Sequence, residues 1–501
     1  MKLVKALFIG AIVMLFAMQN HAQELDVEVG SPMEPIDDDR IGIGMDATKF
    51  YTLRIEKEKK DKLGFIEVWS RTTMQLESTQ AIAVPVVNTD EFKILEVFVV
   101  DDGLRMYYAF FSKEDERRVL AMANFDRDGM MVGDATQLVR VEDSREKSLD
   151  NFAVKHFENA NTTVIMDLKP FGSNTDKSKE NTYRVFALDL SGKLLYDQQV
   201  ELGQAKYCAM QTHYVDDNGN TFLRVSRQSE GEACKHLIVT VNARGVKEWC
   251  DPELLEGSMH SDDHQWVMDA TGNMHYMNML SNLSNSGYLG FVLHSFDKEI
   301  GEHINGYAHK FKDSYPPEDN KKPGKAAFMR YCKSGTASFQ KDGTLNVYGY
   351  KTYLGTGKAG QDGVWKLNFD LVSGFGPLVG CEMERHFFTA TVGDDFSSFF
   401  LHYLMLDGKD YIIANEIRDN IGKPCSSLVG WKAVKPLDNK TEPAYFAMND
   451  GDEFGTRTAL LPRSFGSAQS VHEVIELRGE EYIMRLEADS KEYWVRVRSL
   501  K

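Results

Sequence analysis

The sequence predicts an all-β fold built from repeated antiparallel hairpins, and three observations support this prediction. Short runs rich in Val, Phe, Tyr, Leu and Met alternate with Asp-Gly and related turn sequences along most of the chain. Stretches with the 3.6-residue apolar period of a helix are scarce. The composition, 42% hydrophobic and 27% charged over 501 residues, is that of a globular protein.

The N-terminus has the pattern of a signal peptide over residues 1–22. A basic segment, Met1–Lys5, precedes an apolar run, Ala6–Met18, and a polar end with the small residue Ala22. No second apolar run long enough to span a membrane follows. The protein is therefore expected to be exported, to the periplasm or the extracellular space, with residues 23–45 as an extended leader.

The charge balance restricts the partners. Lys and Arg total 58 against 75 Asp and Glu, which gives a net charge of -17. A chain this acidic, without a long basic run, is a poor ligand for the phosphates of nucleic acid. A protein or a neutral glycan is the partner that we expect.

The hairpins follow one another along the chain. Val97–Val100 and Leu104–Phe111 are separated by Asp101-Asp102-Gly103, and Gly readily takes the positive φ that tight hairpin turns require. Similar turn sequences recur at residues 126–129, 190–192, 217–219, 243–245, 270–272, 341–343 and 407–408. They alternate between two kinds, one opening an aromatic strand and the other following a Phe-Asp or Leu-Asp ending.

The spacing of one kind of turn indicates the size of the repeat. Gly219, Gly272, Gly343 and Gly408 are 53, 71 and 65 residues apart, and two hairpins per interval give four strands per repeat. Such modules are typical of a β-propeller with long loops. Residues 172–181, 314–325 and 420–442 interrupt the pattern and are expected to be surface loops.

On these repeats, residues 46–501 resemble degenerate β-propeller repeat proteins of the secreted bacterial type, without matching a named subfamily. Seven blades fit best, with six or eight open, and tandem β-sandwich domains are the alternative. Three strands at the end, Val471–Ile475, Tyr482–Leu486 and Tyr493–Val497, need a fourth. Phe50–Ile55 is expected to supply it and to close the ring.

One short segment carries the densest set of candidate ligands for a metal. In an extended strand, His260, Asp262 and His264 would share one side, and two His with a carboxylate suit Zn²⁺. The alternative is a polar strand end satisfied by hydrogen bonds. Calcium is a weaker possibility at Asp216–Asn220 or Asp450–Glu453. No cofactor is predicted.

The leading functional hypothesis is a binding or interaction module that engages a protein or polysaccharide at one rim. The alternative is a glycan hydrolase or lyase at the channel mouth, using His213, His260, Asp262, His264 and His386. No catalytic signature is present, which favours a protein that is not an enzyme. Convergence of the five residues at one mouth distinguishes the two hypotheses.

The six cysteines lack a CxxC pair, so neither a metal knuckle nor a redox motif is expected. In an oxidising compartment, a disulfide within the group Cys208, Cys234 and Cys250 is the preferred pairing, and buried free thiols are the alternative.

Overall fold

The computed structural model places strands along almost the whole chain. It describes residues 25–500 except 37, 56–63, 84–91, 115, 142–148, 150–151, 169–181, 203–206, 229–235, 251–257, 283–287, 311–331, 341, 356–357, 372–377, 387–400, 418–420, 423–440, 448–454, 457, 462–467, 478–479 and 489–490. The predicted signal peptide, the segments 172–181 and 314–325, most of 420–442 and the acidic segment 450–453 fall mainly or entirely outside the described residues.

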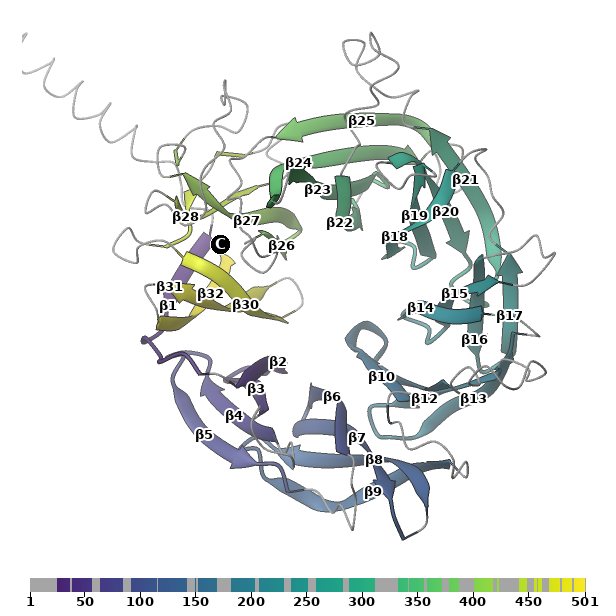
Figure 1. Cartoon of the computed structure of the whole chain (residues 1–501), viewed down its shortest axis with the longest axis vertical. Helices are drawn as coiled ribbons and strands as arrows, with labels where there is room; N and C mark the ends of the chain where they lie inside the picture. The colour runs from purple at the N-terminus through teal and green to yellow at the C-terminus, as the bar shows by residue number, and fades with distance from the viewer. Residues whose placement is uncertain are drawn as a thin grey trace, which may run out of the picture.

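The described strands form eight four-stranded antiparallel sheets arranged in a ring, which is a β-propeller (Figure 1). The predicted fold class is confirmed. The blade number, eight, is one more than the seven that fitted the sequence best, and it is one of the two alternatives left open. Long connections of unequal length between hairpins obscure the repeat interval, so the spacing alone does not fix the count.

The first four blades follow chain order, each from the inner strand outward. Blade 1 is β2 (Asp39–Met45), β3 (Lys49–Ile55), β4 (Gly64–Ser70) and β5 (Leu76–Ala81); blade 2 is β6 (Phe92–Val100), β7 (Gly103–Ser112), β8 (Arg117–Asp126) and β9 (Met131–Val141); blade 3 is β10 (Phe152–Phe157), β11 (Thr162–Leu168), β12 (Thr182–Asp189) and β13 (Leu194–Glu201); blade 4 is β14 (Tyr207–Val215), β15 (Thr221–Gln228), β16 (His236–Asn242) and β17 (Gly245–Cys250). One 3-10 helix, η2 (Glu158–Ala160), connects β10 to β11.

The other four blades complete the ring. Blade 5 is β18 (Ser258–Met268), β19 (Met274–Asn282), β20 (Tyr288–Phe296) and β21 (His303–Lys310); blade 6 is β22 (Cys332–Phe339), β23 (Leu345–Gly355), β24 (Lys358–Leu371) and β25 (Leu378–His386); blade 7 is β26 (Leu401–Leu406), β27 (Lys409–Ile417), β28 (Thr441–Ala447) and β29 (Thr458–Ala459); the closing blade is β30 (Ala468–Leu477), β31 (Glu481–Ala488), β32 (Lys491–Ser499) and β1 (Leu25–Val29).

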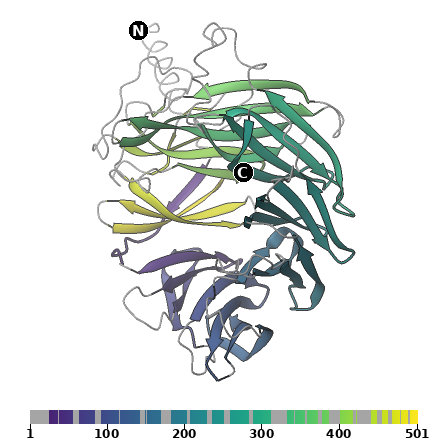
Figure 2. The same cartoon turned by 45° about the vertical axis from the view of Figure 1, so that its right-hand side comes forward.

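The ring is closed by the N-terminal strand β1, which pairs with β32 from Leu25↔Ser499 to Val29↔Val495. In Figure 2 the yellow strands of the closing blade lie between the purple first blade and the green last blades. Two predictions are therefore wrong. Phe50–Ile55 is part of β3 in blade 1 and does not supply the closing strand, and residues 23–45 are not a leader, because they contain β1 and the inner strand β2.

Two faces of the ring differ because of the up-and-down order of the strands. The connections from first to second and from third to fourth strand all lie on one face, which we call the turn face. The other connections lie on the opposite face. Asp turns recur on the turn face at Asp126, Asp189, Asp216 and Asp269, and each Asp side chain accepts backbone N–H bonds from the residues two and four positions later.

A glycine three positions after each of these Asp residues completes the turn. Its φ lies between 78° and 88°, a left-handed conformation that glycine adopts without strain. Its backbone N–H donates to the Asp carbonyl. The Asp-x-x-Gly spacing therefore fixes the local geometry, which is why the sequence locates these turns correctly.

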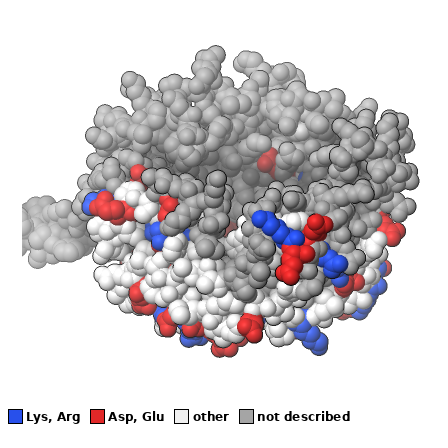
Figure 3. Space-filling view, turned by 60° about the horizontal axis from the view of Figure 1, so that its bottom comes forward, with Lys and Arg blue, Asp and Glu red and all other residues white. Residues whose placement is uncertain are grey.

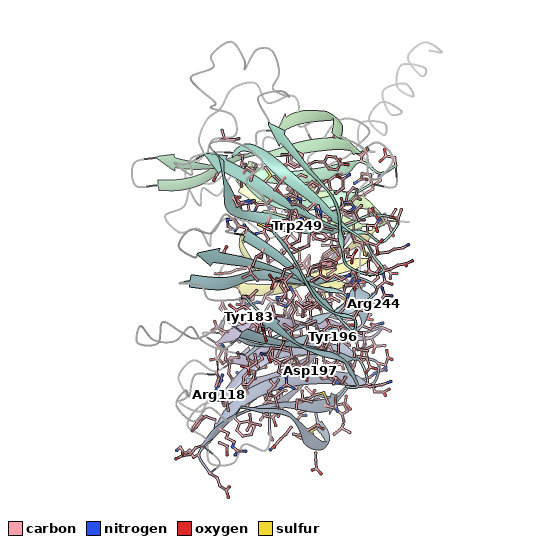
Figure 4. The ribbon with its side chains drawn as sticks, turned by 90° about the vertical axis from the view of Figure 1, so that its right-hand side faces the viewer. Arg118, Tyr183, Tyr196, Asp197, Arg244 and Trp249 are labelled. Carbon is pink, nitrogen blue, oxygen red and sulfur yellow. The ribbon has the colours of Figure 1, made fainter. Side chains whose placement is uncertain are left out.

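The core lies between adjacent blades. One cluster combines Tyr183, Tyr196 and Val200 of blade 3 with Val215 and Leu223 of blade 4. Figure 4 labels Tyr183 and Tyr196 on the sheet that faces blade 4. Other clusters join blades 1 and 2, blades 2 and 3, blades 4 and 5, and blade 7 with the closing blade. Packing against a neighbouring blade therefore stabilises each of these blades.

Most inner strands pair irregularly with the second strand of their blade. Register shifts occur where β2, β6, β14, β18, β22 and β30 pair with their second strands. Such bulges bend a strand and re-aim its side chains, and they are common near functional sites. The shift in β18 lies between His260 and His264, in the segment that the sequence suggests as a metal site.

Two further properties concern membrane-spanning helices and the charge of the surface. Within the described part of the chain, no helix is long and apolar enough to cross a membrane. On the face shown in Figure 3, the described acidic and basic side chains are interspersed. The net negative charge is therefore not gathered into one patch on the described part of that face.

Candidate functional site

The five candidate residues lie on strands of three different blades. His213 lies on the inner strand β14 of blade 4, and His260, Asp262 and His264 lie on the inner strand β18 of blade 5. His386 ends β25, the outermost strand of blade 6. The side chains of Asp262 and His386 are outside the described part of the structure. The three described side chains, those of His213, His260 and His264, contact different sets of residues.

A three-residue bulge separates His260 from His264 in β18. His260 pairs with Leu280 and His264 pairs with Asn278, so three residues of β18 lie opposite one residue of β19. His260 Nδ1 is 3.0 Å from Asn278 Oδ1, and its ring contacts the ring of His236 in blade 4 at a centroid distance of 4.3 Å. The His260 ring therefore bridges two strands of its own blade and the neighbouring blade.

His264 faces a different set of partners. Its Nδ1 is 3.0 Å from Arg224 Nη1, and Arg224 is buried and stacks over Tyr276 at 5.7 Å. A guanidinium cannot accept a hydrogen bond, so this contact requires His264 Nδ1 as the acceptor. Arg224 also donates to the Ser261 carbonyl in the bulge. These bonds attach blade 4 to the bulged strand of blade 5.

Metal binding gains no support from the described side chains. Among the residues that the structure describes, no group of three or more His, Cys, Asp or Glu is placed to hold an ion. At the Asp216 turn, Oδ1 accepts two backbone N–H bonds and Oδ2 accepts the Asn220 amide. The carboxylate therefore serves the turn.

His213 is enclosed between blades 3 and 4. Its ring packs edge-on against Phe157 at 5.5 Å, and its buried Nε2 has no hydrogen-bond partner among the described residues. Burial, with a smaller contribution from the charge of Lys155, lowers the pKa of His213 to about 4. His213 is therefore neutral at pH 7.

We expect His213 to make the fold sensitive to mild acid. The unfolded histidine has a pKa near 6.5, so between pH 6.5 and 4 the unfolded chain binds a proton that the folded chain does not. Stability from this residue is complete above pH 6.5 and falls as the pH decreases towards 4, by about 2–3 kcal/mol at pH 4.5. Urea unfolding of the wild type and His213→Phe at pH 7.5 and 4.5 measures this. If both proteins lose the same stability on acidification, His213 is not the cause.

One Ser, one His and one Asp in blade 5 lie in hydrogen-bond contact, which the sequence analysis missed. Ser295 Oγ is 2.9 Å from His275 Nδ1, and Asp269 Oδ2 is 3.0 Å from His275 Nε2. Ser295 and His275 are each 1% exposed, so a substrate cannot reach this serine. Burial favours a raised pKa for Asp269, but the bonds from His275, Thr271 and the Asn273 backbone outweigh it and lower the pKa. The three side chains connect the turn to β19 and β20.

A pocket of about 240 Å³ lies where blade 6, blade 7 and the closing blade meet. Its wall consists of residues near the turn-face ends of the first and second strands of these blades. They are Thr336, Ala337, Ser338, Tyr348, Tyr403, Leu404, Met405, Asp410, Tyr411, Glu476 and Tyr482. Four tyrosines and two carboxylates therefore share a small space.

Tyrosine hydroxyls hold both carboxylates in place. Tyr348 donates to Asp410 Oδ2 at 2.8 Å, and Tyr482 lies 2.8 Å from Glu476 Oε1. The Tyr482 hydroxyl also contacts the backbone of Met405 in blade 7. Burial is the main cause of a raised pKa for Tyr482, and the negative charges of Glu476 and Asp410 add to it. Both carboxylates therefore act on the same phenol.

A glycine allows Tyr403 to reach this wall. Gly335 is the bulged residue of β22, between Ser334 and Thr336. A Cβ on Gly335 would lie 2.5 Å from the Tyr403 ring, closer than any side chain tolerates. The rings of Tyr403 and Tyr348 are 6.4 Å apart. No signal in the sequence predicts the pocket, because its lining residues belong to three blades that are separate in the sequence.

Comparison with known proteins gives only remote similarities to solved structures. No family model and no curated protein matches the chain. The WD40 domain of SCAP from fission yeast is 10% identical, with a TM-score of 0.43 over 95% of this chain and 98% of that chain. Saccharomyces cerevisiae Sqt1 is 10% identical, with a TM-score of 0.40 over 93% and 97%. Puromycin hydrolase is 10% identical, with a TM-score of 0.36 over 81% of this chain and 52% of that chain. At these values the similarity carries no information about the function of this chain.

Proposed function

We propose that the chain is an exported β-propeller that binds a partner protein on its turn face, at the pocket between blades 6, 7 and the closing blade. The observation that carries the proposal is the pocket itself, because three blades contribute side chains to it and short hairpins frame it. A site on rigid strands loses little conformational entropy when a partner binds. Met405, 46% exposed at its edge, extends the contact area.

Export is the second part of the proposal. The apolar segment at residues 6–18 favours it, and Cys250 at the end of β17 is disulfide-bonded. Disulfides persist mainly in oxidising compartments. The protein isolated from its host is then expected to begin at Gln23.

Site-specific photo-crosslinking in the native host tests the proposal. A benzoylphenylalanine at Met405 is expected to capture one protein in a defined ratio. The matched control is Met130, which is 52% exposed on the turn-face hairpin between β8 and β9, on another part of the ring. Capture at Met405 alone supports the proposal. No protein adduct at Met405, or equal capture at both positions, contradicts it.

A further inference from the structure

The pocket has the chemistry of a receptor for a positive charge. Two carboxylates and four tyrosine side chains line it, and none of the described lining residues is Lys or Arg. Tyrosine rings present a negative face that attracts ammonium and guanidinium groups. Because Asp410 and Glu476 each bond to a tyrosine hydroxyl, their charges are held at the wall.

Its size restricts the occupant. Pockets for drug-sized ligands have volumes of roughly 300–1,000 Å³. At about 240 Å³, this one suits a single side chain or another small group. The apolar parts of Leu404 and Met405 lie beside the charged groups in the same wall. An aliphatic stem that ends in a cation matches both parts.

We infer that the pocket binds a lysine or arginine side chain of the partner, with Asp410 and Glu476 as counter-charges and the tyrosines as the surrounding wall. This inference rests on the proposed function, since it names the group that the partner inserts. A neutral glycan also stacks on tyrosines and can donate its hydroxyls to carboxylates, but it carries no positive charge for the two carboxylates to attract. The charge requirement therefore separates the two ligands.

Binding of small probes to the mature protein tests the inference. The probes are Ac-Ala-Lys-Ala-NH₂, Ac-Ala-Arg-Ala-NH₂, the neutral norleucine analogue, n-butylamine and cellobiose. Methionine methyl NMR reports on the pocket through Met405, with Met130 as an internal reference, and a Met405→Leu variant assigns the signal. The two cationic peptides are expected to shift Met405 and to bind about tenfold or more tightly than the norleucine peptide.

Isosteric variants test the counter-charges without removing the acceptors. In Asp410→Asn and Glu476→Gln, the side-chain oxygen can still accept the tyrosine hydroxyl, but the charge is gone. Each is expected to weaken the cationic peptides about tenfold. Asp407→Asn is the matched control: Asp407 is an exposed carboxylate in the β26–β27 turn with φ 49°, which Asn also adopts, and it does not line the pocket. Asp407→Asn is expected to leave affinity within about twofold.

The other outcomes overturn the inference. They are equal binding of the lysine and norleucine peptides, binding of cellobiose in preference to the peptides, and n-butylamine binding as tightly as the lysine peptide, which would make the site one for free amines. No shift at Met405 with any probe also overturns it. A protein crosslink at Met405 without charge preference removes this inference alone, whereas charge-dependent peptide binding without a protein crosslink removes the proposed function.

Discussion

Deleting residues 23–33, which contain strand β1, is expected to abolish the cooperative unfolding of the propeller. Leu25 is fully buried in the cluster that joins blade 7 to the closing blade. Loss of one buried leucine costs about 2–5 kcal/mol, and whole proteins are stable by only about 5–15 kcal/mol. The deletion also removes Asp26 and Glu28, the ion-pair partners of Arg498. It exposes β32 as an unpaired edge.

Complementation in trans makes this prediction specific to strand pairing. Near-UV circular dichroism and urea unfolding are measured for the deleted protein, alone and with a synthetic peptide of residues 23–34. The peptide is expected to restore the transition by adding the missing strand. A control peptide with Leu25→Ser and Val27→Ser should not restore it. An unchanged unfolding midpoint in the deleted protein would show that β1 does not hold the ring closed.

The predictable part of this fold is local. Asp189 and Gly192 lie within one turn, and the hydrogen bonds from Ser191 and Lys193 to the Asp189 carboxylate involve neighbours in the sequence. Such a motif forms with little dependence on the rest of the chain. The hairpins, the four-stranded modules and the fold class therefore follow from the sequence.

The unpredictable part depends on contacts between distant residues. Leu25 and Ser499 pair across 474 positions, and no short pattern distinguishes β1 from an extended leader. The first hairpin of blade 1 is not predicted from the sequence either, because its turn contains Asp46 and Thr48 but no glycine. Without β1 and β2, Phe50–Ile55 is the first strand that the sequence predicts, and it is therefore the expected closing strand.

The site shows the same division. Alternation predicts that His260 and His264 share a side of an extended strand, but the register shift between them sends each ring to a different partner. Bulges depend on how an inner strand meets its neighbours, which the sequence of one strand does not specify. The pocket is not predicted from the sequence for the same reason, since Tyr348, Asp410 and Tyr482 belong to three blades.

Replacing Glu492 by glutamine is expected to destabilise the protein by about 3–5 kcal/mol, because it leaves the buried Arg485 guanidinium without its carboxylate partner. Glu492 contacts two arginines: Arg485 Nη1 at 2.9 Å and Arg40 Nη1 at 3.3 Å. Arg40 also pairs with Glu67 at 2.7 Å, and all four side chains are less than 10% exposed. These charges join the closing blade to blade 1, where the ring is sealed.

An exposed ion pair at the same seam provides the control. Glu34 and Lys491 are 3.0 Å apart, but their side chains are 82% and 45% exposed, and such pairs contribute less than about 1 kcal/mol. In urea unfolding at pH 7.5, Glu34→Gln should therefore be close to wild type while Glu492→Gln is not. The double variant Arg485→Leu/Glu492→Leu should recover part of the loss, since Arg40 keeps Glu67 and one unpaired cation is removed. Equal effects of Glu492→Gln and Glu34→Gln would mean that the buried cluster adds no more to closure than a surface pair, and that strand pairing with the interblade core seals the ring.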